Sequence, residues 1–258
     1  MSDFADVYPR RLEWGRVFRG TAGVIGREPL LILGFGVLLG AVPSILSSFL
    51  IGARTSAGAI GVLGSPFYWL QLVFNILFAS FMQAALFQVI FQALGGRRAN
   101  LGEVLANSAK FFLPLFAVNL GYSVAVAIGF VLLIVPGVMM ALAWCVAAPA
   151  LIAERTGITQ VFGRSAQLTR NHRWSILGLA VIAFVALMIL EGVLFAVGLR
   201  AGVGAVTSAV GSPVGIIVAG IVSGLFQAAA ASVIAVLYAE LRSLKDGVAS
   251  ESLAEVFD

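Results

Sequence analysis

Residues 134–182 read IVPGVMMALAWCVAAPALIAERTGITQVFGRSAQLTRNHRWSILGLAVI, and this stretch decides the fold of the chain. It begins with a Val135-Pro136-Gly137 turn, which is followed by an apolar helix. A basic helix with one apolar face is expected over Ile158–Arg170, and a second long apolar helix comes after it. This order predicts a membrane hairpin that is joined to the next one by a helix lying on the membrane surface.

The composition places most of the chain in lipid. Hydrophobic residues make up 60% of the sequence and charged residues 11%, with a mean hydropathy of +1.05, whereas a soluble domain carries about 25% charged residues. So few charges cannot cover a surface that faces water. The formal charge of +4 does not indicate nucleic-acid binding. The arginines stand instead at the ends of apolar segments, a pattern typical of topology signals and contacts with anionic lipid.

Applied to the whole chain, the same reasoning predicts an all-α integral membrane protein. Residues 1–258 are expected to form a single membrane domain that ends in a polar tail over 246–258. Three amphipathic surface helices are predicted over Glu13–Arg27, Leu101–Lys110 and Ile158–Arg170. Six membrane spans are predicted over Pro29–Ile51, Pro66–Leu94, Phe111–Val135, Val138–Ala153, Trp174–Leu199 and Pro213–Leu241.

The basic residues set the expected orientation. Of the 16 lysine and arginine residues, all but Arg54 and Arg200 fall on one side of the six-span arrangement. By the positive-inside rule that side is the cytoplasm, so both termini and the three surface helices are expected on the cytoplasmic side of the inner membrane. An alternative, in which Val135-Pro136-Gly137 lies in a re-entrant hairpin, preserves this orientation.

The three expected surface helices resemble one another. Arg16-Val17-Phe18, Glu103-Val104-Leu105 and Gln160-Val161-Phe162 align at offsets of 87 and 57 residues, and four positions after each valine stands Thr or Ser followed by Ala. These matches predict a threefold repeat of surface helix, span and span. Chance agreement within an apolar alphabet is the alternative explanation. The predicted units are residues 13–98, 99–155 and 156–245.

The stretch around Pro136-Gly137, with Arg164–Thr169 before Trp174 and with Tyr238–Arg242 near the end of the chain, resembles a known family. This family is related to the membrane domain of glycerophosphoryl diester phosphodiesterases. The resemblance implies a polytopic inner-membrane protein whose biochemical role is largely unassigned. The phosphodiesterase chemistry would need several His and Glu residues on a soluble barrel, and this sequence has 1 histidine. The enzymatic activity is therefore not carried over.

Polar groups inside the predicted spans are the first candidates for function. Glu191 lies well inside a span, and an intramembrane carboxylate indicates proton or cation coupling or a bound headgroup. Pairing with Arg200 or Arg54 near the outer interface is the structural alternative. Amides in the spans either line a polar cavity or bond one helix to another. These amides are Gln71, Asn75 and Gln83 of the second span and Gln227 of the sixth.

Basic side chains on the surface helices are candidates for contact with anionic lipid, and topology signalling is a compatible explanation for them. On the sixth span, Gly220, Gly224 and Ala228 form a stripe of small residues, which predicts close packing within the bundle or in a homodimer. His172 and Cys145 have no partners at ligand spacing, so neither a metal nor a cofactor is expected. The candidate lipid contacts are Arg16, Arg19, Arg164, Arg170 and Arg173.

These features favour a non-enzymatic multi-pass membrane protein that acts as a scaffold, a regulator or a lipid-interacting module. Its expected partners are membrane lipids, a second copy of the chain and an unidentified membrane protein. The runner-up is a small transporter or lipid-translocating protein with a polar cavity between the repeats. A membrane-embedded enzyme comes third, because no catalytic set of residues is visible in the sequence.

Overall fold

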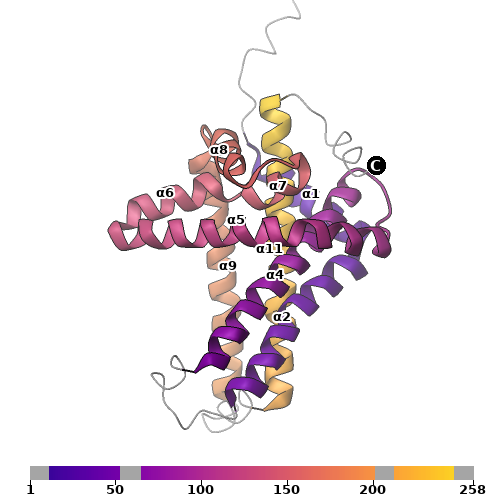
Figure 1. The fold of residues 1–258 in the computed structure, drawn as a ribbon, viewed down its shortest axis with the longest axis vertical. Coiled ribbons are helices and arrows are strands. Elements are labelled where there is room, and N and C mark those ends of the chain that lie inside the picture. Colours follow the sequence, from indigo (N-terminus) through magenta and orange to yellow (C-terminus); the bar gives the residue numbers. More distant parts are fainter. Residues whose placement is uncertain (1–11, 53–64, 201–211, 247–258) are drawn as a thin grey trace, which may run out of the picture.

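Every regular element is a helix in the parts of the chain that the computed structural model describes, which are residues 12–52, 65–200 and 212–246 (Figure 1). Within them, five helical segments are long and apolar enough to cross a membrane, or six if α8 and α9 are counted as one bent span. This confirms the prediction of an all-helical chain with several helices able to cross a membrane. The helices are α1 (Trp14–Arg27), α2 (Pro29–Gly52), α4 (Pro66–Leu94), α5 (Leu101–Leu132), α6 (Ile134–Trp144), α7 (Ala147–Glu154), α8 (Ile158–Thr169), α9 (Arg173–Arg200) and α11 (Pro213–Asp246).

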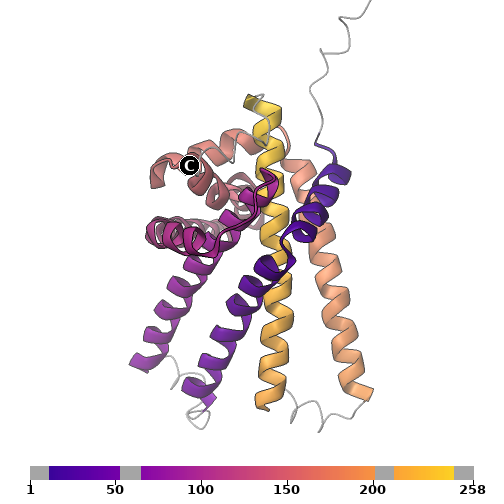
Figure 2. The same ribbon diagram turned by 90° about the vertical axis from the view of Figure 1, so that its right-hand side faces the viewer.

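The helices fall into two sets with different directions. Helices α2, α4, α9 and α11 run along the long axis of the molecule, whereas the hairpin of α5 and α6 lies across them (Figures 1 and 2). Helices α1, α7 and α8 gather at the end where α11 finishes. The arrangement differs from six parallel spans at the third and fourth predicted spans.

Helix α5 merges two predicted elements. The surface helix expected over Leu101–Lys110 and the span expected over Phe111–Val135 form one helix, with Pro114 accommodated inside it. Pro29 separates α1 from α2, and a polar turn over 170–172 separates α8 from α9 with a bend of 95°. In α5 the ring of Pro114 meets the carbonyl of Lys110, four residues before it, yet the helix continues through both residues.

Pro136 ends α5, but the turn lies three residues before it. A helix continuing past Leu132 would bring the proline ring against the carbonyl of that residue. The chain instead becomes extended at Leu133, with φ −164° and ψ 150°, and Pro136 occupies the first turn of α6, where its missing N–H needs no partner. The turn expected at Val135-Pro136-Gly137 is thus corrected to Leu133.

The fourth predicted span, Val138–Ala153, is also divided. Helix α6 ends at Trp144 and α7 begins at Ala147, because the ring of Pro149 would clash with the carbonyl four residues earlier, at Cys145, in a continuous helix. Helix α7 then packs beneath α8, and Val146, Ala150 and Ile152 are fully buried there. Hydropathy alone predicts a single apolar segment here and misses the break.

Helices α2 and α11 make the most extensive packing contact among the described elements, and glycines allow it. A Cβ atom on Gly40 would lie 2.1 Å from the carbonyl oxygen of Gly220, and one on Gly224 would lie 2.3 Å from that of Gly36. Ala228 joins the same seam, since its Cβ would be 2.5 Å from a Cβ on Gly36. The stripe Gly220, Gly224 and Ala228 therefore packs within the chain, as one of the two alternatives predicts, and the homodimer stays a prediction.

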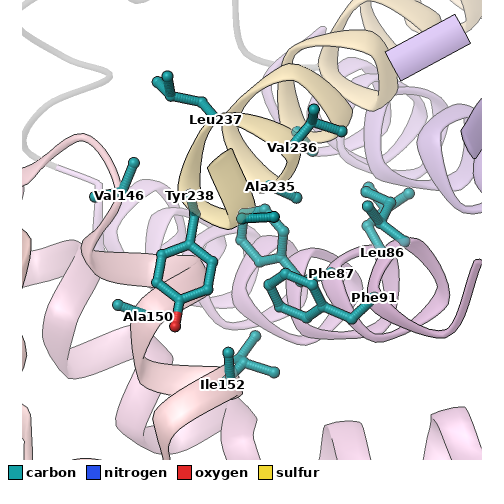
Figure 3. Packing of buried hydrophobic residues seen from close by; sticks show 14 of the residues in the cluster. Leu86, Phe87, Phe91, Val146, Ala150, Ile152, Ala235, Val236, Leu237 and Tyr238 are labelled. Carbon is teal, nitrogen blue, oxygen red and sulfur yellow. The ribbon is translucent and has the colours of Figure 1, made fainter. Parts of the chain in front are cut away.

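The hydrophobic core lies toward the end where α1, α7 and α8 meet α4 and α11. Tyr238 of α11 packs edge-on against Phe91 of α4 with ring centroids 5.9 Å apart, and Phe91 stacks on Phe87 with centroids 6.4 Å apart (Figure 3). At the other end of the bundle, Leu70 and Val214 are largely exposed. Apolar side chains that are exposed on a helix bundle are typical of a surface that faces lipid.

The positions matched by the proposed repeat share one environment. Val17, Val104 and Val161 are all fully buried. The hydroxyls four residues later are buried as well: Thr21 donates to the Val17 carbonyl (2.8 Å), and Ser108 donates to the Val104 carbonyl (2.6 Å). In the third unit, the Ser165 hydroxyl donates instead to the Ala143 carbonyl of α6. The threefold repeat itself stays a prediction, since the second unit has no separate surface helix.

Candidate functional site

The predicted basic residues belong to elements at one end of the molecule. Helix α1, helix α8, the beginning of α9 and the final turns of α11 all lie at this end (Figures 1 and 2). We call it the basic end, defined by Arg16, Arg19, Arg164, Arg170 and Arg173. Each of these side chains has a different environment, and only some of them remain available to a ligand.

Arg164 is held inside the protein by two carboxylates. Its Nε donates to both oxygens of Glu154, at 3.0 and 2.9 Å, and its terminal nitrogens pair with Asp246. The hydroxyl of Tyr238 donates to the same Glu154 carboxylate at 2.9 Å. This cluster ties α7, α8 and α11 together, and it occupies the guanidinium that the sequence suggested as a lipid contact.

Arg16 and Arg19 follow one another on α1 but have different surroundings. The Nε of Arg16 forms an ion pair with Glu240 of α11 at 2.7 Å. Arg19 is exposed at the mouth of a cavity of about 320 Å³ between α1 and α11, which Gly20 and Val236 also line. Arg19 is therefore accessible, while Arg16 secures α1 to α11.

Arg170 and Arg173 stand on either side of the bend between α8 and α9. Together with Asn171 they line a cavity of about 380 Å³, whose remaining walls come from apolar residues of α6 and α9. We call it the α6–α9 cavity. Arg170 is exposed, whereas the Nε of Arg173 is buried and has no hydrogen-bond partner.

Two of the amides of α4 link this helix to α5, and the predicted polar cavity lined by the amides stays a prediction. Asn119 of α5 donates to the Gln83 side chain at 2.8 Å, and Gln88 donates to Ser108 of α5 at 3.0 Å. Gln71 is buried, and its Oε1 has no partner, as is also true of the Oδ1 of Asn75. Gln227 is exposed on α11 and belongs to no such group.

The remaining candidate residues, Glu191, His172 and Cys145, give little evidence for a functional site. Glu191 belongs to α9, but its side chain lies outside the described residues. His172 is half-buried, and burial together with the positive charge of Lys245 lowers its pKa. Cys145 is a free cysteine that donates to the Leu142 carbonyl at 3.2 Å. Across the described residues, His, Cys, Asp and Glu form no group that could hold a metal ion.

Sequence reasoning missed the partners of Arg164. Glu154 directly follows the predicted span Val138–Ala153, and Asp246 begins the predicted polar tail. Glu154 is ten residues from Arg164, but Asp246 is 82 residues away, so no local spacing could reveal the cluster. The sequence offered one weak signal, a tyrosine at 238 within an apolar segment, because a phenol that is buried there needs a polar partner.

Comparisons with family models, with curated proteins and with solved structures found no match for this chain.

Proposed function

We propose that the chain is a non-enzymatic, multi-pass protein of the cytoplasmic membrane that binds anionic phospholipid at its cytoplasmic face and serves there as a scaffold. One observation carries the proposal: the basic end holds α1, α8 and the start of α9 on the same side as the crosswise α5–α6 hairpin (Figures 1 and 2). Basic side chains next to a membrane surface attract anionic lipids.

The depth of the hairpin supports this placement. Helix α5 bonds α4 at Gln83 and Gln88, which at 1.5 Å per residue lie roughly 26 and 33 Å along α4 from Pro66. The hydrocarbon core is about 30 Å thick. If the Pro66 end of α4 marks the outer boundary, α5 and α6 lie along the cytoplasmic boundary and α2, α4, α9 and α11 cross the bilayer. Both termini then share the cytoplasmic side, as the charges require.

The surface of the hairpin fits the same placement. Val131 to Val135, at its tip, are between 68% and 87% exposed. Such an apolar tip is unfavourable in water and favourable in the acyl region of one leaflet. Trp174, at the start of α9, is 83% exposed, and tryptophan is enriched at membrane–water interfaces. The hairpin and Trp174 thus support one common level for the cytoplasmic boundary.

The proposal can be tested by quenching tryptophan fluorescence with brominated lipids. The protein is reconstituted into phosphatidylcholine vesicles that contain either brominated phosphatidylglycerol or brominated phosphatidylcholine. We expect stronger quenching by the brominated anionic lipid at low salt, and a smaller difference when salt screens the charges. Equal quenching by the two lipids at low salt would refute selective binding of anionic lipid.

A small transporter is the second candidate, and the amide oxygens of Gln71 and Asn75 favour it. Both are buried without a partner, and an unpaired buried acceptor is costly unless water or a solute reaches it. An Asn75→Cys variant in a Cys145→Ala background tests this. Reaction with an impermeant thiosulfonate would indicate a water-filled path and favour transport, whereas protection from the reagent would support the scaffold.

A further inference from the structure

We propose that the α6–α9 cavity is a binding site for one anionic phospholipid, with its phosphate at Arg170 and Arg173 and an acyl chain along the apolar wall. The inference rests on the proposed function and deepens it, since it assigns the lipid contact to one site. The sequence suggested both arginines as lipid contacts but gave no reason to join them with α6.

The cavity has the two-part lining that a phospholipid requires. Its volume is about 380 Å³, and its polar groups come from Arg170, Asn171 and Arg173 at the bend between α8 and α9. The opposite wall is apolar and includes Val138 of α6 and Leu177 of α9. An inorganic anion would gain nothing from this wall, whereas an acyl chain buries apolar area against it.

Arg173 supplies an unpaired donor. Its Nε is buried and has no hydrogen-bond partner, and a guanidinium stays charged at any physiological pH. A buried charged donor without an acceptor is unfavourable, and a phosphate oxygen would satisfy it with a charge-assisted hydrogen bond. None of the described residues that line the cavity is acidic. Arg164 differs in this respect, because Glu154 and Asp246 already neutralise it.

The position of the cavity gives a lipid access from the side. Ile134 and Val135, which line it, belong to the exposed tip of the hairpin. Trp174, another lining residue, lies at the level that we assign to the cytoplasmic boundary. A lipid of the cytoplasmic leaflet could therefore enter between α6 and α9 without leaving the membrane. Its phosphate would then meet the two arginines at headgroup height.

Native mass spectrometry tests the site directly. The protein is extracted from bilayers of phosphatidylcholine and phosphatidylglycerol, and the retained lipid is counted for the wild type and for Arg173→Gln. We expect about tenfold less retained phosphatidylglycerol in the variant, the effect of losing a hydrogen bond to a charged group. Arg98→Gln removes the same charge from an exposed residue outside the cavity, and it should retain lipid like the wild type.

A second variant tests the apolar wall without changing any charge. Val138→Trp fills the space between α6 and α9, so it should also lose the retained phosphatidylglycerol while keeping the thermal stability of the wild type. Excess inorganic phosphate should displace no lipid, and displacement would assign the arginines to a free anion instead. Equal retention by wild type and Arg173→Gln, or an equal loss in Arg98→Gln, would overturn the site. The proposed function would still stand if brominated phosphatidylglycerol remained the stronger quencher.

Discussion

Replacing Gly40 by alanine would place a Cβ atom 2.1 Å from the Gly220 carbonyl oxygen and 2.5 Å from the Gly224 amide nitrogen. Both neighbours are backbone atoms, so no side-chain rotation relieves the contact. Helices α2 and α11 would have to separate by about 1 Å, which forfeits a quarter to a half of the dispersion energy at each affected contact. Overpacking of this kind costs about 1–3 kcal/mol.

Gly34→Ala is the matched control in the same helix. Apart from its chain neighbours and the backbone of its own helix, no heavy atom of the described residues lies within 4 Å of the position that its Cβ would take. The substitution makes the same gain in helix propensity of up to about 1 kcal/mol. The difference in unfolding free energy between the two variants therefore isolates the contact between α2 and α11. Reversible unfolding in mixed detergent micelles, followed by circular dichroism, measures it. Equal stability of Gly40→Ala and Gly34→Ala would refute the backbone contact.

Two further predictions concern the basic end. Tyr238→Phe removes the hydrogen bond to the Glu154 carboxylate and should lower the unfolding free energy by about 1.5–3 kcal/mol. The control Tyr68→Phe, at the far end of α4, should change the unfolding free energy less. Equal effects of the two substitutions would contradict the buried cluster. Burial and the charge of Lys245 lower the pKa of His172, so the unfolded chain binds the proton more readily and stability should fall as the pH drops through about 6.5. Thermal melts at several pH values should show this loss in the wild type but not in His172→Gln, and an identical loss in that variant would refute it.

The sequence predicts the bounds of several helices well because prolines mark them. Helices α4 and α11 begin at Pro66 and Pro213, where a missing N–H costs nothing. Pro136 and Pro149 act differently, since each breaks a segment that hydropathy reads as continuous. Both breaks fit the clash between a proline ring and the carbonyl four residues before it. The rule alone does not predict them, because Pro43 and Pro114 lie inside the continuous helices α2 and α5.

The direction of α5 could not be predicted in the same way. The hydropathy of a segment indicates that the segment prefers lipid. It does not indicate whether the segment crosses the bilayer or lies within one leaflet. The links that hold α5 across α4 are single amide and hydroxyl pairs, such as Gln83 with Asn119, and they join residues far apart in the sequence. The same limit explains why Gln227 was grouped with amides that it does not meet.

The central claim is that the α5–α6 hairpin lies along the cytoplasmic leaflet and does not cross the membrane. Single cysteines at Leu133, in the hairpin turn, and at Ser65, before α4, can be introduced into a Cys145→Ala background. Sealed vesicles of both orientations are then treated with an impermeant maleimide. We predict that Ser65→Cys reacts only in right-side-out vesicles, whereas Leu133→Cys, at a tip that lies in the acyl region of the cytoplasmic leaflet, is not labelled from the outside. Reaction of Leu133→Cys from the outside would show that α5 crosses the bilayer and would contradict the account.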